Sequence, residues 1–146
     1  MRLFFILLIP FSASATSLDN GLHALQAADY PGAAQELRVA VAERPRDAIA
    51  HFNYASALRE LGQYEDALGE YQAAVREARD PVVRSDALYG IALVRNQQGE
   101  PTRAAEAWRD YLSFAENRPA DASAVEIARV NLAAAEREQG TRKASR

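Results

Sequence analysis

The chain has 146 residues, of which 49% are hydrophobic and 25% are charged, and this length and composition fit one soluble domain rather than two. Its 17 Lys and Arg and 20 Asp and Glu give a net charge of −3, so we expect no basic surface for nucleic-acid phosphates. Cysteine is absent, which excludes disulfides, thiolate metal ligands, cysteine nucleophiles and a lipid-acceptor thiol.

The first 15 residues have the pattern of a secretory signal peptide. Arg2 is followed by an apolar run over residues 3–11 and then by Ala13-Ser14-Ala15, the small-x-small pattern that signal peptidase accepts. The run is much shorter than the roughly 20 residues that a membrane span needs. We therefore expect cleavage after Ala15, export to a compartment that is most simply the bacterial periplasm, and no stable membrane insertion of the mature chain.

Beyond Thr16 the sequence predicts only helices. Apolar residues recur three and four positions apart, and strong helix formers are frequent. Aspartate, proline and glycine mark the expected helix ends. The expected N-caps are Asp47, Asp80 and Asp121, the first-turn prolines are Pro31, Pro81 and Pro101, and the closing glycines are Gly62, Gly99 and Gly140. The predicted helices are 18–28, 31–43, 47–61, 64–78, 82–98, 101–115 and 121–139.

A pattern of small and large residues recurs along these helices, first after 34 residues and then after 37. The small residues in the first helix of each pair are Gly21, Ala55 and Ala92. The second helices carry Ala33 with Ala40, Ala67 with Ala74, and Ala104, and the large residues between or after them are Leu37, Tyr71 and Trp108. A helix pair repeated at this spacing is typical of a helical solenoid. On these residues the chain resembles the tetratricopeptide repeat family over residues 18–115.

The resemblance implies an all-α, right-handed α-solenoid of about three helix hairpins, closed by a C-terminal capping helix. The expected domains are the signal peptide 1–15, the repeat domain 16–140 and a basic disordered tail, 141–146. In such a stack, small residues let neighbouring helices approach closely, and the large residues fill the space beside them. The recurring pattern therefore reports packing rather than chemistry.

No constellation of catalytic or metal-binding residues stands out. His23 and His51 are 28 residues apart, and neither has a second histidine at metal spacing. No G-x-S-x-G, G-x-G-x-x-G or Walker loop is present. We therefore expect a structural or solvated role for His51, no cofactor and no enzymatic activity, with a hydrolase kept as a distant alternative.

The resemblance implies a concave surface lined by the first helix of each repeat, which binds a protein or peptide segment. The groove positions carried over from the family are Phe52, Asn53, Ser56, Arg59, Tyr89, Leu93, Asn96, Gln97, Asn131, Ala134 and Arg137. Amides can pair with a peptide backbone, aromatic rings with apolar side chains, and guanidinium groups with carboxylates. Phe52 and Tyr89 occupy equivalent positions, and they either form an aromatic step on the concave wall or pack as core.

The predicted function is therefore that of an exported, non-catalytic adaptor or scaffold, with another protein as its partner. The Lys and Asn pair of the two-carboxylate clamp in chaperone-binding members is missing, since Leu18 and Leu22 occupy those places. A chaperone-tail adaptor is accordingly disfavoured. The alternative is a membrane-tethered accessory factor of cell-envelope assembly, which a retained signal segment would produce.

Overall fold

The computed structural model describes residues 16–145, which form seven α-helices and one short 3-10 helix without any β-strand. The helices in chain order are α1 (Ser17–Gln26), α2 (Tyr30–Glu43), α3 (Ala48–Glu60), α4 (Tyr64–Glu77), α5 (Pro81–Gln97), α6 (Pro101–Ala115), η1 (Pro119–Asp121) and α7 (Ala122–Ala144). The all-α prediction is confirmed. The predicted signal peptide lies outside the described residues.

Short-range capping sets where most helices begin. The side chain of Asp47 accepts hydrogen bonds from the backbone N–H groups of Ile49 and Ala50, and that of Asp80 accepts one from Val82. Two of the three predicted N-caps are thus confirmed. Two further caps were not predicted. Thr16 forms a capping box at the start of α1, and Asp29 caps α2 through the N–H of Gly32.

The turns within the three hairpins need a left-handed residue. Gly62 and Gly99 have φ angles of +73° and +67°, as expected for glycines that end helices. The equivalent position of the first hairpin is Ala28, with φ of +56°. A residue with a Cβ is disfavoured in this conformation by about 1 to 2 kcal/mol. The turn between α1 and α2 is therefore strained in a way that the other two are not.

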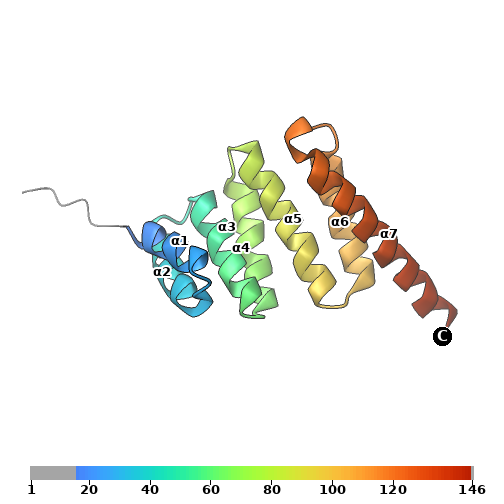
Figure 1. The fold of residues 1–146 in the computed structure, drawn as a ribbon, viewed down its shortest axis with the longest axis horizontal. Coiled ribbons are helices and arrows are strands. Elements are labelled where there is room, and N and C mark those ends of the chain that lie inside the picture. Colours follow the sequence, from blue (N-terminus) through green and yellow to red (C-terminus); the bar gives the residue numbers. More distant parts are fainter. Residues whose placement is uncertain (1–15, 146) are drawn as a thin grey trace, which may run out of the picture.

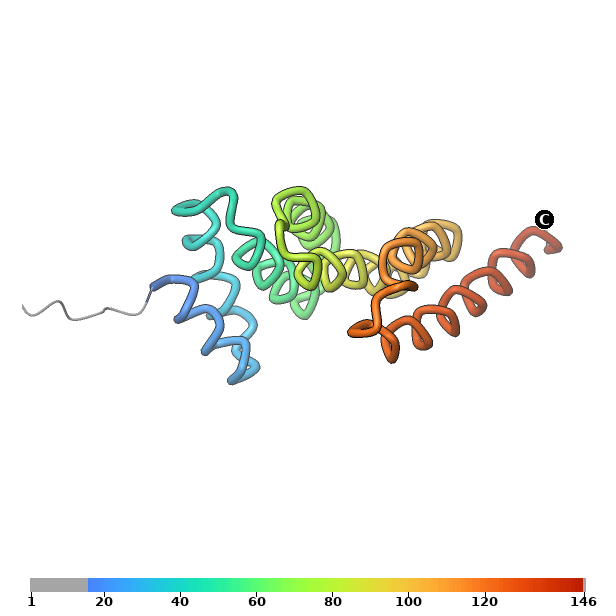
Figure 2. Tube along the Cα trace, turned by 90° about the horizontal axis from the view of Figure 1, so that it is seen from above, coloured from blue at the N-terminus to red at the C-terminus, as the bar shows by residue number. Residues whose placement is uncertain are grey.

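The helices form three antiparallel hairpins, α1/α2, α3/α4 and α5/α6, which follow one another along the long axis (Figure 1). Seen from above, the chain progresses steadily from α1 at one end to α7 at the other (Figure 2). Each second helix also packs on the first helix of the next unit, so that α6 packs on α7. The first helices α1, α3 and α5 contact one another in turn. They form one layer of the stack, and the second helices form the other.

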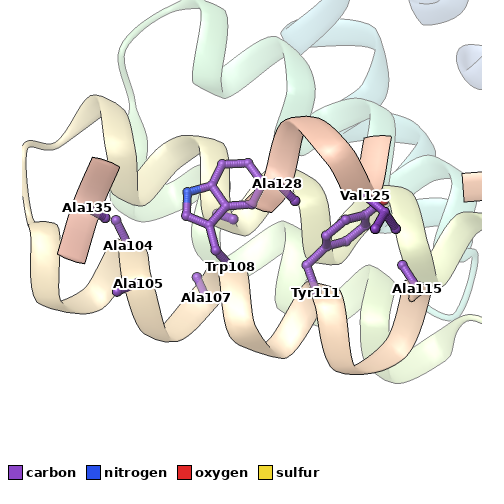
Figure 3. Packing of buried hydrophobic residues seen from close by; sticks show 10 residues of the cluster. Ala104, Ala105, Ala107, Trp108, Tyr111, Ala115, Val125, Ala128 and Ala135 are labelled. Carbon is purple, nitrogen blue, oxygen red and sulfur yellow. The ribbon is translucent and has the colours of Figure 1, made fainter. Parts of the chain in front are cut away.

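The core consists of three alanine-rich clusters, each of which spans one hairpin and the first helix of the next unit. Around α6, the rings of Trp108 and Tyr111 are fully buried between small side chains and the inner face of α7 (Figure 3). The α7 residues of this cluster are Val125, Ala128 and Ala135. Because the alanines allow close backbone approach, the two aromatic rings fill the remaining volume. This confirms the packing role that the repeat pattern predicted for Ala104 and Trp108.

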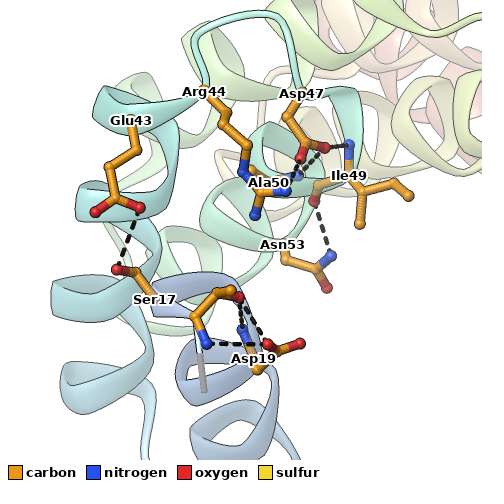
Figure 4. A network of polar contacts seen from close by, with 9 residues as sticks. Ser17, Asp19, Glu43, Arg44, Asp47, Ile49, Ala50 and Asn53 are labelled. Carbon is orange, nitrogen blue, oxygen red and sulfur yellow. Dashed lines mark hydrogen bonds and ion pairs between the residues drawn. The ribbon is translucent and has the colours of Figure 1, made fainter. Parts of the chain in front are cut away.

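Polar contacts join the two helices of the first hairpin and brace the turn to the second hairpin. Ser17 on α1 donates to the carboxylate of Glu43 at the end of α2 at 3.4 Å, and Arg44 pairs with Asp47 at 3.2 Å across the α2–α3 turn (Figure 4). The first hairpin is thus held at its N-terminal edge, although α1 has only 10 residues.

His51 is a structural residue, as predicted. Its buried ring places Nδ1 2.6 Å from the Glu70 carboxylate of α4 and Nε2 3.0 Å from the carbonyl oxygen of Pro45. The ring thereby links α3 to α4 and to the preceding turn. Both ring nitrogens are satisfied by protein groups, so neither is available for a ligand.

The C-terminal part of the chain differs from the prediction in two respects. Gly140 does not end the last helix, because α7 continues to Ala144 and includes most of the tail predicted to be disordered. Arg142 explains the extension, since it pairs with Glu138 one turn earlier and donates to the carbonyl oxygen of Gly99 at 3.3 Å. A glycine costs a helix only about 1 kcal/mol, and these contacts offset it.

The second difference concerns Asp121, which was expected to cap the last helix. It makes no side-chain capping bond to α7. Its carboxylate instead accepts hydrogen bonds from Ser85 of α5 at 3.0 Å and from Arg118 at 2.6 Å. The prediction was wrong because a buried hydroxyl and a neighbouring guanidinium compete for this carboxylate, and charge-assisted bonds are the stronger ones.

Candidate functional site

A hollow of about 180 Å³ opens between α3 and α5 in the layer of first helices. Five of the predicted groove residues line it, namely Phe52, Ser56, Arg59, Tyr89 and Leu93. It also includes three residues that were not predicted, Tyr71, Asp86 and Gly90. The hollow thus combines aromatic walls with one basic residue, Arg59, and one acidic residue, Asp86. We call it the α3/α5 hollow.

The two aromatic walls are half-buried and supported from behind. The Phe52 ring packs on Tyr71 of α4 with centroids 5.8 Å apart. The Tyr89 ring meets Trp108 and Tyr111 of α6 edge-on, with both centroid distances at 5.2 Å. Aromatic pairs at these distances and angles hold their rings in place. Phe52 and Tyr89 therefore have both of the expected roles, because each ring packs on the core and also lines the hollow.

Close approach of α4 and α5 forms the floor. A Cβ built on Gly90 would lie 2.5 Å from Cζ of Tyr71, so only glycine fits beside this ring. The Tyr71 hydroxyl lies 3.1 Å from Oγ of Ser56, which also donates to the carbonyl oxygen of Phe52. Burial raises the pKa of Tyr71 above its ordinary value. The phenol therefore stays neutral and lies against the backbone of α5.

The charged residues of the hollow are Arg59 and Asp86. One terminal nitrogen of Arg59 binds the neighbouring Glu60, but its Nε is buried and has no hydrogen-bond partner among residues 16–145. Asp86 makes no ion pair or side-chain hydrogen bond within that same range. Partial burial, together with repulsion from Asp121 and Asp80, raises the pKa of Asp86 above its ordinary value. Both side chains have unused bonding capacity.

A second hollow, of about 220 Å³, lies between the α5–α6 turn and α7. Three predicted residues line it, Asn96, Asn131 and Ala134. Asn96 has a structural task as well, because its side-chain oxygen accepts a hydrogen bond of 3.2 Å from Nε1 of the buried Trp108. The predicted single groove is thus two separate hollows on the same layer of helices.

Three predicted groove residues line neither hollow. The Asn53 side chain donates to the carbonyl oxygen of Ile49 one turn earlier at 2.8 Å (Figure 4). Gln97 and Arg137 are exposed on α5 and α7. Their assignment as binding residues stays a prediction.

Sequence reasoning missed Asp86 and the contribution of α4. A signal for Asp86 was present, since it precedes Tyr89 by one helical turn and therefore shares its face of α5. Tyr71 was placed correctly as a packing residue, but its reach across to the hollow follows only from the missing Cβ of Gly90.

None of the helices within residues 16–145 combines the length and apolarity that a bilayer crossing requires.

These features define an all-α helical-repeat protein whose layer of first helices carries two solvent-open hollows. Residues 18–81 match the model of the tetratricopeptide repeat family. The predicted resemblance to this family is thereby confirmed for that segment, which is a little under half of the chain.

Among curated proteins, the chain is similar to the photosystem I assembly protein Ycf3 of Cyanophora paradoxa, with 30% identity over 79 residues that cover 54% of this chain and 46% of that protein. It matches the protein of the same name from Synechococcus elongatus at 34% identity over 58 residues, or 40% of this chain and 34% of the relative. The chain thus aligns with less than half the length of each of these relatives.

Two solved structures resemble the fold. The TPR2B domain of yeast Sti1 in a complex with pHsp70 has a TM-score of 0.72 at 20% identity, covering 84% of this chain and 94% of that one. The type III secretion chaperone SycD of Yersinia enterocolitica, in complex with a peptide of the translocator YopD, has a TM-score of 0.75 at 15% identity, covering 84% and 92%. At these identities the likeness concerns the fold.

Proposed function

We propose that this protein is a non-catalytic adaptor that holds a peptide or protein segment on its layer of first helices. The observation that carries this proposal is the α3/α5 hollow, where two supported aromatic walls stay half-exposed beside the partly exposed guanidinium of Arg59. Rigid aromatic surfaces with a nearby guanidinium are typical of the residues that dominate binding energy at protein interfaces.

The energetics favour an apolar ligand group in this hollow. Fully burying a large apolar side chain contributes roughly 1.5 to 3 kcal/mol, and the half-buried rings of Phe52 and Tyr89 still expose part of their surface. Because Trp108, Tyr111 and Tyr71 already hold these rings, little conformational entropy is lost when a ligand packs on them. The similar proteins support the same class of function, since Ycf3 is an assembly protein, the Sti1 domain is in a complex with pHsp70 and SycD is in a complex with a YopD peptide.

A peptide selection tests this proposal. A random peptide library displayed on phage is selected on the purified protein, and the enriched peptides are then measured against Phe52→Ala, Tyr89→Ala and Arg59→Glu. We expect each variant to weaken binding by about tenfold or more. Gln72→Ala, on the exposed face of α4, serves as the matched control and should bind as the unmodified protein does.

Folding of every variant is checked first by far-UV circular dichroism and thermal melting. Unchanged affinity in all three well-folded variants would place the ligand elsewhere and refute the assignment to this hollow. If no enriched peptide also binds the purified protein in solution, that result would count against the adaptor function itself.

We further propose that the protein works outside the cytoplasm, after removal of residues 1–15. The support is the sequence pattern of an apolar run followed by Ala13-Ser14-Ala15. The intact mass of the protein isolated from a bacterial host should correspond to a chain that begins at Thr16. Recovery of the full-length chain from carbonate-washed membranes would instead support a retained tether.

A further inference from the structure

The two charged side chains of the α3/α5 hollow lie at different levels along the helices. Phe52 and Tyr89 occupy equivalent positions of successive repeats, so Asp86 is level with Ile49 of α3, and Arg59 lies ten residues further along that helix. At 1.5 Å per residue this is about 15 Å between backbone positions. Helical side chains lean toward the N-terminus, which brings the guanidinium of Arg59 closer to Asp86. The hollow is therefore anionic at one end and cationic at the other.

At the cationic end, the Nε–H group of Arg59 is a hydrogen-bond donor without an acceptor among residues 16–145. The contact of Arg59 with Glu60 uses one terminal nitrogen, whereas the buried Nε has no partner within the described chain. An unsatisfied buried donor is unfavourable by about 1 to 3 kcal/mol. A carboxylate from a ligand would bind the exposed part of the Arg59 guanidinium through the charge-assisted hydrogen bonds that guanidinium groups favour.

At the anionic end, Asp86 is solvent-exposed on one side and lines the hollow. Partial burial, followed by the like charges of Asp121 and Asp80, raises the pKa of Asp86 above its ordinary value. The nearby cations are engaged elsewhere, since Arg118 binds Asp121 and Arg84 lies over the Phe114 ring at 5.6 Å. Such a charge lowers the stability of the free protein and would be stabilised by a cation that arrives with a ligand.

We propose that the α3/α5 hollow selects a dipolar segment of a partner protein, with its cationic side chain at Asp86, its carboxylate at Arg59 and an apolar side chain between them on Phe52 and Tyr89. An extended strand rises about 3.3 Å per residue, so the two charges would be separated by roughly two to four intervening residues. This inference rests on the proposed adaptor function and adds the chemistry of the partner.

The test uses synthetic peptides of about ten residues, labelled with a fluorophore and blocked at both ends. All share an apolar core and carry two variable positions with roughly three residues between them. The dipolar peptides contain Lys and Glu in either order, and the comparison peptides contain two Lys, two Glu or two Gln. Affinity is measured by fluorescence anisotropy at physiological ionic strength, where charges separated by more than about 8 Å are largely screened.

We expect one dipolar peptide or both to bind the unmodified protein about tenfold more tightly than each comparison peptide. Arg59→Glu should shift the preference to the peptide with two Lys, and Asp86→Arg should shift it to the peptide with two Glu. The double exchange, Arg59→Glu with Asp86→Arg, should restore the dipolar preference. A merely structural role of these residues would not produce that rescue. Arg76→Glu on the exposed surface of α4 is the control and should leave the preference unchanged.

The outcomes separate this inference from the proposal on which it rests. Equal binding of all peptides, combined with weaker binding to Tyr89→Ala, would overturn the charge selection and keep the adaptor function. Absence of binding by every peptide would overturn this inference, and the phage selection would then decide the adaptor function independently. If Arg59→Glu fails to fold because of the adjacent Glu60, Arg59→Gln replaces it. This variant should abolish the contribution of the peptide carboxylate to the binding affinity.

Discussion

Two glycines of the repeat domain provide a matched test of the packing between α4 and α5. Gly69 and Gly90 both lie inside helices, so replacing either with alanine removes the same helical disadvantage of glycine, about 1 kcal/mol. Their surroundings differ. A Cβ at Gly69 would meet no atom within 4 Å, whereas a Cβ at Gly90 would lie 2.5 Å and 2.6 Å from two ring atoms of Tyr71.

The Tyr71 ring cannot move aside without disturbing the core, because it is only 2% exposed and packs on Phe52. Overpacking of this kind is unfavourable by about 1 to 3 kcal/mol. Gly69→Ala should therefore stabilise the protein by about 1 kcal/mol, whereas Gly90→Ala should range from about neutral to 2 kcal/mol destabilising. The difference between the two variants isolates the clash.

Urea unfolding followed by far-UV circular dichroism measures both free energies of unfolding on the same scale. Tyr71→Phe is not expected to relieve the clash, because the overlapping atoms belong to the ring, but Tyr71→Leu in the Gly90→Ala background should. Equal stabilisation by the two alanine substitutions would show that the Tyr71 ring does not lie against α5, and the described floor of the α3/α5 hollow would then be wrong.

Three further changes test other parts of the structure. Ala28→Gly should stabilise the protein by about 1 kcal/mol, since it relieves a left-handed alanine; an unchanged or lower urea midpoint would contradict the strain. Ala67→Leu should destabilise by about 1 to 3 kcal/mol, because Ala67 is fully buried between paired helices, whereas Gln72→Leu on the exposed face should change stability by less than about 0.5 kcal/mol. Asp86→Asn should raise the melting temperature slightly at neutral pH. Partial burial and nearby aspartates raise the pKa of Asp86 in the folded protein above its unfolded value of 3.8. Above the folded-state pKa the carboxylate is ionised and opposes folding. The gain should fade as the pH falls toward 3.8, and a pH-independent gain would exclude titration as its cause.

The hairpins and their ends could be predicted from sequence because their causes are local. A cap such as Asp47 acts on backbone groups two and three residues away, and the left-handed turns at Gly62 and Gly99 depend on one residue each. The alanine and aromatic pattern also predicted the resemblance to the repeat family and the pairing of helices, since close approach requires small side chains at fixed intervals. The prediction of first helices forming one layer follows from the same repeat.

Contacts between residues far apart in the chain were decided only by the tertiary structure. Asp121 has the local pattern of a cap, yet its carboxylate binds Ser85, 36 residues away. Gly140 has the local pattern of a helix end, yet Arg142 reaches the carbonyl of Gly99 and α7 continues.

The candidate site shows the same division. Phe52, Ser56, Arg59, Tyr89 and Leu93 were predicted from their positions in the repeat, because equivalent positions of a solenoid face the same side. The sequence alone did not show that Tyr71 extends from the second layer beneath Gly90, that one groove is divided into two hollows, or that Asp86 has no partner among residues 16–145. Those properties depend on which side chains meet in space. Helical periodicity gives the direction of a side chain, and the packing of neighbouring helices decides what it touches.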